Sequence, residues 1–207
     1  MVRIFFSFLF FFTFCVSQDF DVKYYNLELD FDIKNKFIKG SNEIYFDVKK
    51  NINTLEIDLF DNFSVDSILY LNSKCKFQHK NNTISIFFDS DLEYKNHSVK
   101  IFYKGHPIIA KNPPWEGGFV WEKDSFNDDW IGVACQGIGA SIWWPNHDVL
   151  YDEPDSMRLS ATVPKKLQVV SNGNLFFKKD TLIDDVEKTV FIWKTSSPIN
   201  NYNVSVN

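Results

Sequence analysis

The sequence has 207 residues, of which 44% are hydrophobic and 24% are charged, a balance typical of a globular protein with a sizeable core. Its formal net charge of −5 argues against nucleic acid as the main partner, because phosphate binding requires clustered Lys and Arg.

The first 17 residues have the pattern of a secretory signal peptide. Arg3 supplies a positive charge, and the apolar run at 4–14 has the length of a signal-peptide core and is short for a membrane span. Small residues at the end of the segment favour cleavage after Ser17. We therefore expect residues 1–17 to be removed from an exported protein, periplasmic or extracellular. The alternative is an uncleaved membrane anchor.

Alternation of apolar and polar residues begins at Tyr25 and predicts half-buried β-strands. The first runs from Tyr25 to Ile33, and a turn at 34–36 joins it to a hairpin partner at Ile38–Val48. Shorter strands are predicted at Leu55–Leu59, Ser67–Leu71, Thr83–Phe88 and Ser98–Tyr103.

A long loop is predicted to begin at His106-Pro107 and to include the aromatic, glycine-containing stretch Trp115–Trp121. Strands are then predicted at Met157–Val163, Gln168–Asn172, Thr189–Trp193 and Asn201–Val206, the last of them cut short. The mature sequence shows no sustained helical period and no Pro/Gly/Ser linker. We therefore expect one all-β domain over residues 18–207, a sandwich or a set of packed sheets.

The sequence contains no complete catalytic motif. A zinc peptidase helix would need two His one turn apart with a Glu between them, and no pair of His here has that spacing. It also lacks a phosphate-binding loop, a nucleophile elbow and a C-x-x-C pair. The His residues are His79, His97, His106 and His147. Cys75 and Cys135 are predicted to be unpaired and mostly buried thiols.

A short segment contains His147, Asp148, Asp152 and Glu153, which are residue types that ligate metals. Single His residues next to carboxylates are common in ordinary loops. We therefore favour a loop with solvated or hydrogen-bonded acids over a metal site.

Five tryptophans between positions 115 and 144 allow two interpretations. They could form a carbohydrate-binding face, but aromatic residues at this density more often pack between sheets or against another domain. We favour packing for this set: Trp115, Trp121, Trp130, Trp143 and Trp144.

Three motifs in this region carry a family resemblance. They are Ala134-Cys135-Gln136-Gly137, Trp143-Trp144-Pro145 and Asp152-Glu153-Pro154. Together they resemble the N-terminal domain of M1-family zinc metallopeptidases, the gluzincin family of aminopeptidase N, in its bacterial branch. The resemblance extends over the whole mature chain. Two motif positions depart from the family pattern. The family has Gln where this chain has Ala134, and Ala where this chain has Gly137.

The resemblance implies a saddle-like domain of several β-sheets that packs on a catalytic domain encoded beyond Asn207. That domain would bind the zinc cofactor, so no catalytic or metal-binding residue is expected in this chain. The full enzyme would remove N-terminal residues from peptides. Gln136, with Gly137 beside it, matches the position that contacts the substrate α-amine, and a side-chain oxygen suits that role because it accepts hydrogen bonds from an ammonium.

The expected partners are thus peptide substrates and the chain's own catalytic domain, with no nucleic acid and no stable membrane span. The fragment alone is expected to be inactive. The alternative function is a non-enzymatic, exported β-sandwich module that binds glycans or proteins.

Overall fold

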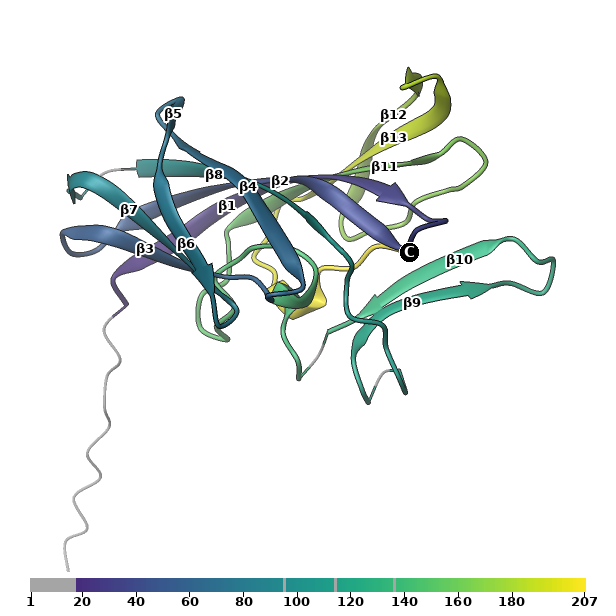
Figure 1. Cartoon of the computed structure of the whole chain (residues 1–207), viewed down its shortest axis with the longest axis horizontal. Helices are drawn as coiled ribbons and strands as arrows, with labels where there is room; N and C mark the ends of the chain where they lie inside the picture. The colour runs from purple at the N-terminus through teal and green to yellow at the C-terminus, as the bar shows by residue number, and fades with distance from the viewer. Residues whose placement is uncertain (1–17, 95, 114, 136) are drawn as a thin grey trace, which may run out of the picture.

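The computed structural model describes residues 18–94, 96–113, 115–135 and 137–207 (Figure 1). These residues form three β-sheets and two short 3-10 helices. In chain order the elements are β1 (Phe20–Asp32), β2 (Phe37–Val48), β3 (Ile52–Asp58), β4 (Phe63–Tyr70), β5 (Ser73–Lys74), β6 (Lys76–Lys80), β7 (Thr83–Leu92), β8 (Asn96–Gly105), β9 (Gly118–Lys123), β10 (Asp129–Ala134), η1 (Ala140–Ile142), β11 (Ser156–Pro164), β12 (Asn174–Ile183), β13 (Val186–Thr195) and η2 (Asn201–Asn203).

The largest sheet has eight strands in the order β12-β13-β11-β1-β2-β8-β4-β5. Strand β1 pairs in parallel with β11 on one side and antiparallel with β2 on the other. Figure 1 shows this sheet as the upper layer, with its two ends, β5 and the β12–β13 hairpin, turned upward like a saddle. The all-β class and the saddle shape expected from the sequence are both confirmed.

The core lies under the large sheet. The apolar residues predicted to share one face of β1, Tyr25, Leu27, Leu29 and Phe31, are all buried, whereas the polar residues between them face outward. Burying each such side chain contributes about 1.5–3 kcal/mol to folding, so this face fixes the register of β1 against its neighbours.

Two smaller sheets lie beneath the large one (Figure 1). One has the order β3-β7-β6, and the other is the hairpin β9–β10. The prediction of a long loop is wrong at this hairpin, because Gly118–Lys123 pairs along its length with Asp129–Ala134. Phe119 is buried there and stacks on the half-buried Trp121, which gives the hairpin its apolar face.

Two further strand predictions are wrong. Gln168–Asn172 forms only an isolated bridge, from Ser171 to Val206. The segment 201–206 begins instead with the helix η2. Strand β12, which the sequence pattern did not indicate, is a full ten residues long.

Residues 1–17, the predicted signal peptide, lie outside the described residues, so the predicted cleavage after Ser17 remains a prediction. Among the residues that are described, no helix is both long and apolar enough to cross a membrane.

Candidate functional site

The predicted substrate-contact residues belong to the turn from Cys135 to Gly139, which follows β10. Gln136 itself lies outside the described residues. The Cys135 carbonyl accepts hydrogen bonds from the N–H groups of Ile138, at 3.2 Å, and Gly139, at 2.8 Å, so the chain doubles back at this point. Gly137 is exposed at a φ of 85°, with open space where a side chain would begin. Gly137 is therefore accessible to a ligand.

Cys135 anchors the start of the turn. Its side chain is buried, and the thiol donates a hydrogen bond to the Tyr202 carbonyl at 3.1 Å. Burial raises the pKa of this thiol to about 11, so it is protonated at neutral pH and can act as the donor. Both Cys135 and Cys75 have free thiols.

Asp148 anchors the end of the turn. Its Oδ2 accepts hydrogen bonds from the Ser141 N–H at 2.9 Å and the Ser141 hydroxyl at 2.7 Å. Gly139 has a φ of 94°, and a Cβ there would lie only 2.2 Å from the same Asp148 oxygen. Only glycine fits this close approach.

A second carboxylate holds Asp148 in place. The Asp148 N–H donates to Asp58 Oδ2 at 2.9 Å, and the backbones of Asp58 and Asn146 bond reciprocally at 2.8 Å and 3.1 Å. Burial raises the pKa of the Asp58 carboxyl, against the lowering effect of the Asp148 N–H. The turn is thereby fixed to the small β3-β7-β6 sheet. Sequence reasoning missed Asp58, because nothing local to it indicates a partner 90 residues away.

The tryptophan pair, Trp143 and Trp144, follows the helix η1 and lies in the core. Trp143 and Trp144 are fully buried, and the Trp144 ring packs edge-on against Tyr25 with centroids 4.9 Å apart. Asn42 Nδ2 donates a hydrogen bond to the carbonyl of Pro145 at 2.8 Å, and this bond holds the residue that follows the tryptophan pair. Packing was the favoured interpretation for all five tryptophans. It is confirmed for Trp143 and Trp144, and Trp121 is half-buried, whereas Trp115 and Trp130 are exposed.

The loop that carries Trp115 lies beside the turn. A Cβ on Gly117 would lie 2.4 Å from the Ala134 carbonyl oxygen and 2.8 Å from Ile138 Cγ2, so the two segments are in close contact. Trp115 is 83% exposed at the end of this loop. An exposed aromatic side chain therefore lies on a loop that contacts the turn through Gly117.

His147 and Asp152 bond to each other and leave no open metal site between them. His147 Nδ1 lies 2.5 Å from Asp152 Oδ2, and the buried Asp152 carboxylate also accepts the Val22 N–H, at 3.2 Å and 3.3 Å. Glu153 is exposed. Within the described ranges no group of three or more His, Cys, Asp or Glu could hold a metal ion, so these residues do not fit a zinc site.

The sequence by itself matches no family model and no curated protein. A mutant of a two-domain M1 zinc metallopeptidase bound to L-arginine has a TM-score of 0.75 at 14% identity, over 92% of this chain and 42% of that one. The M1 zinc metallopeptidase from Deinococcus radiodurans has a TM-score of 0.75 at 14% identity, over 91% of this chain and 42% of that one.

Native leukotriene A4 hydrolase from Saccharomyces cerevisiae has a TM-score of 0.68 at 17% identity, over 91% of this chain and 28% of that one. This chain thus spans less than half the length of each of these three proteins. The chain therefore shares its fold with the part of these M1 zinc metallopeptidases that it covers.

Proposed function

We propose that this chain is the N-terminal β-domain of a zinc-dependent aminopeptidase of the M1 family. The observation that carries this proposal is the fold match over 92% of the chain with a TM-score of 0.75. The motifs around Gln136, Trp144 and Asp152 add support, because they resemble those of the same family. We place the zinc and its ligands in a catalytic domain encoded beyond Asn207, because this chain covers only 42% of the length of similar zinc metallopeptidases.

The 135–139 turn forms part of one wall of the substrate cleft. Gln136 accepts a hydrogen bond from the α-ammonium of the peptide, and Gly137 leaves room for that amine to approach. The described anchors favour this role, because Cys135 and Asp148 fix both ends of the turn. A turn whose two ends are held in place before the substrate binds loses little entropy on binding.

The Trp115 loop contacts the catalytic domain. Trp115 is 83% exposed on a loop that contacts the 135–139 turn, and tryptophan side chains are enriched where protein surfaces meet. We also propose that the protein is exported and that residues 1–17 are removed as a signal peptide. N-terminal sequencing of the protein from its native host should begin at Gln18, and a first residue of Met1 in the exported fraction would contradict the cleavage.

The activity test compares the complete gene product with the isolated chain. The complete protein should hydrolyse aminoacyl 4-nitroanilides, lose that activity to a chelator, and regain it with zinc. The isolated chain should bind no stoichiometric zinc and hydrolyse none of these reporters. A complete, folded, zinc-loaded protein that cleaves no aminoacyl reporter or short peptide would contradict the proposed activity. Tight one-to-one zinc in the isolated chain would contradict the placement of the metal.

A further inference from the structure

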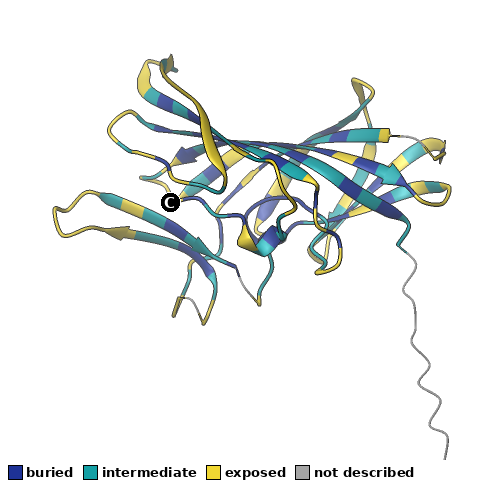
Figure 2. Ribbon diagram, turned by 180° about the vertical axis from the view of Figure 1, so that it is seen from behind, coloured by how far each residue is buried: buried dark blue, intermediate teal, exposed yellow. Residues whose placement is uncertain are grey.

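Strand β12 (Asn174–Ile183) is an exposed edge of the large sheet. It is the outermost strand, and none of its ten residues is buried. Figure 2 shows most of its length in the colour of exposed residues, and Figure 1 shows the β12–β13 hairpin rising clear of β9 and β10. An edge strand presents a row of backbone N–H and C=O groups that another strand can pair with.

The hairpin is also unusually apolar for a surface. Five of its large hydrophobic side chains are between 43% and 64% exposed, out of sixteen such side chains in the described residues. They are Leu175, Phe176, Phe177, Leu182 and Val186. Apolar edge strands of this length are the surfaces on which β-sheets associate.

Two of the three charges on β12, those of Lys178 and Asp180, are complementary to β12 itself. In an antiparallel pair, two residues that face each other have side chains on the same side of the sheet, so their positions differ by an even number. If a two-fold axis relates the two strands, one residue must therefore face its own copy, and the axis passes between these two residues. With Lys179 on the axis, Lys178 of each copy faces Asp180 of the other, which gives two pairs of opposite charge, and the two Lys179 residues face each other as one pair of like charge. Phe177 faces Thr181 in the same register, again twice.

Neighbouring registers lose this complementarity. With Lys178 on the axis, Asp180 faces Phe176, and with Asp180 on the axis, Lys178 faces Leu182. Only the Lys179 register therefore pairs opposite charges directly, and such cross-strand pairs favour one register over another. A β-bulge between Leu175 and Phe177 limits regular pairing to the stretch that begins at Phe177.

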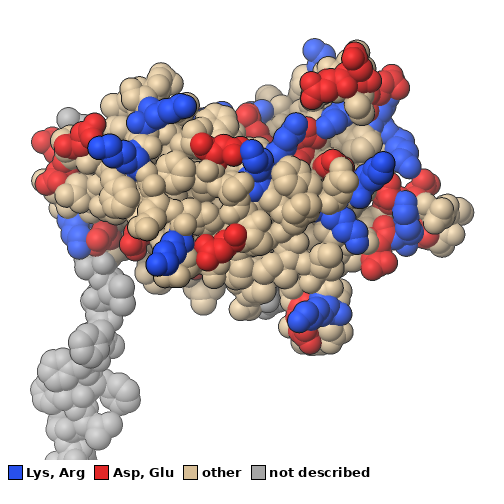
Figure 3. Space-filling view, in the orientation of Figure 1, with Lys and Arg blue, Asp and Glu red and all other residues tan. Residues whose placement is uncertain are grey.

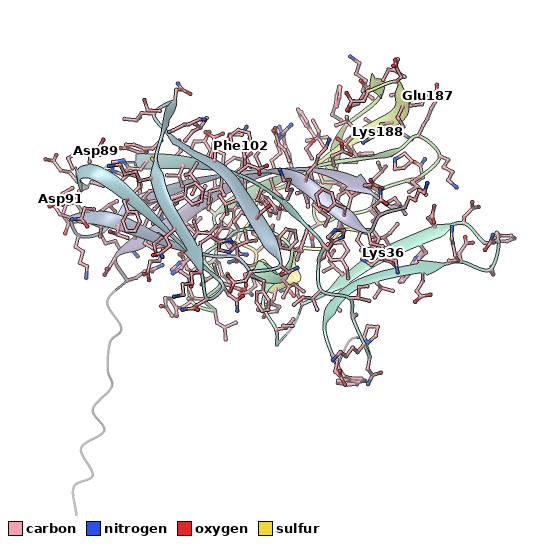
Figure 4. The ribbon with its side chains drawn as sticks, viewed as in Figure 1. Lys36, Asp89, Asp91, Phe102, Glu187 and Lys188 are labelled. Carbon is pink, nitrogen blue, oxygen red and sulfur yellow. The ribbon has the colours of Figure 1, made fainter. Side chains whose placement is uncertain are left out.

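We propose that β12 pairs with β12 of a second copy of this chain, antiparallel and centred on Lys179. The large sheet would then run continuously through the dimer. Figure 4 shows Glu187 and Lys188 of β13 near the free end of the hairpin, and Figure 3 shows charges of both signs there, so this end of the hairpin is polar. The pairing is independent of the proposed peptidase activity.

A cysteine at the axis tests the register. Facing residues in an antiparallel pair have Cα atoms about 4.5–5.5 Å apart, within the range of about 4.4–6.8 Å that a disulfide spans. Lys179→Cys should therefore give a covalent dimer under mild oxidation. Lys178→Cys alone and Asp180→Cys alone should not, because their own copies lie on a diagonal of about 7–8 Å. A mixture of these two variants should cross-link.

The unsubstituted chain, which contains Cys75 and Cys135, measures the background of this reaction. Cross-linking of Lys179→Cys at the background level would overturn the pairing. Cross-linking of Lys178→Cys as fast as Lys179→Cys would overturn the register. The readout is specific to β12, so association through the exposed Trp115 does not affect it.

Charge exchange provides a second, equilibrium test by sedimentation. Lys178→Asp and Asp180→Lys should each raise the dimer dissociation constant about tenfold, because each creates two like-charge pairs across the strands. The double variant Lys178→Asp/Asp180→Lys should restore the original dissociation constant. Thr189 donates a hydrogen bond to Asp180 at 2.7 Å, so melting temperatures are measured for every variant. A folded double variant that stays as weak as the singles, or an unsubstituted chain that stays monomeric at all concentrations, would overturn the proposal.

Discussion

Asp152 joins the segment after the tryptophan pair to strand β1. Its carboxylate is buried, and it accepts both the Val22 N–H and His147 Nδ1. Val22 pairs with Phe46 of β2 on one side, and the pairing of β1 with β11 on the other side begins only at Tyr24, so β11 offers Val22 no partner there. A buried group that satisfies two partners cannot be removed without leaving both unpaired.

Removing this carboxylate should destabilise the chain strongly. Asp152→Ala should lower the free energy of unfolding by about 3 kcal/mol or more, the range for breaking a buried hydrogen-bonded pair. The adjacent Glu153→Ala is the matched control, because Glu153 is exposed, and its effect should stay within about 0.5 kcal/mol. Urea denaturation measures both. Equal stability of the two variants would show that Asp152 has no anchoring role.

Gln136 is tested in the complete enzyme. If its side chain accepts a hydrogen bond from the substrate ammonium, Gln136→Ala should weaken transition-state binding by about 1.5–3 kcal/mol. That loss corresponds to a fall in kcat/KM of about tenfold to over a hundredfold. Gln136→Glu should be tolerated, because it keeps an acceptor and adds a complementary charge.

A purely structural Gln136 would give the opposite pattern, in which the melting temperature falls and the folded enzyme keeps its kcat/KM. Measuring kcat/KM and thermal stability for both variants separates the two roles. Unchanged kcat/KM in fully folded Gln136→Ala would end the substrate-contact proposal.

At the scale of elements, the 135–139 turn contains two glycines whose surroundings differ. Both have positive φ, 85° at Gly137 and 94° at Gly139, which costs a residue with a Cβ about 1–2 kcal/mol. An added Cβ meets open space at Gly137, whereas at Gly139 it would lie 2.2 Å from Asp148 Oδ2.

The two alanine variants should therefore differ in stability. Gly137→Ala should lower the free energy of unfolding by about 1–2 kcal/mol, and Gly139→Ala by about 3 kcal/mol or more, because it adds a clash to the same backbone strain. Chemical denaturation of the two proteins gives the difference. If Gly139→Ala proves no less stable than Gly137→Ala, Asp148 does not lie against the turn as described.

The strands that the sequence predicted correctly have one buried face. Alternation located β1, β2, β8 and β11, because apolar residues at every second position cover the core there. Strand β12 was missed because it is exposed on both faces and so shows no alternation. Its position in the sheet comes from pairing with β13, which a local pattern does not report.

The candidate site was predictable only in part. The motifs pointed to Gln136 and Gly137 through a family resemblance, and single residues of their type would not have done so. The groups that hold the turn come from distant parts of the chain: Tyr202 binds Cys135 and Asp58 binds Asp148. Such long-range contacts depend on the completed fold, so no local spacing encodes them.

At the scale of the whole molecule, the described residues present two surfaces, and we expect a different partner at each. The Trp115 loop and the 135–139 turn lie side by side and are proposed to face a catalytic domain and its substrate. Strand β12, at one end of the large sheet, is proposed to face a second copy. The buried core between them carries no described metal site.

The central claim is that this chain is the front part of a zinc aminopeptidase, and the coding DNA that follows codon 207 tests it most directly. The account predicts an in-frame continuation that contains H-E-x-x-H, the two His and the Glu of a zinc peptidase helix, followed by a third, acidic ligand. Intact genomic DNA with a stop codon directly after position 207, or a continuation without such a motif, would contradict it and favour a binding module.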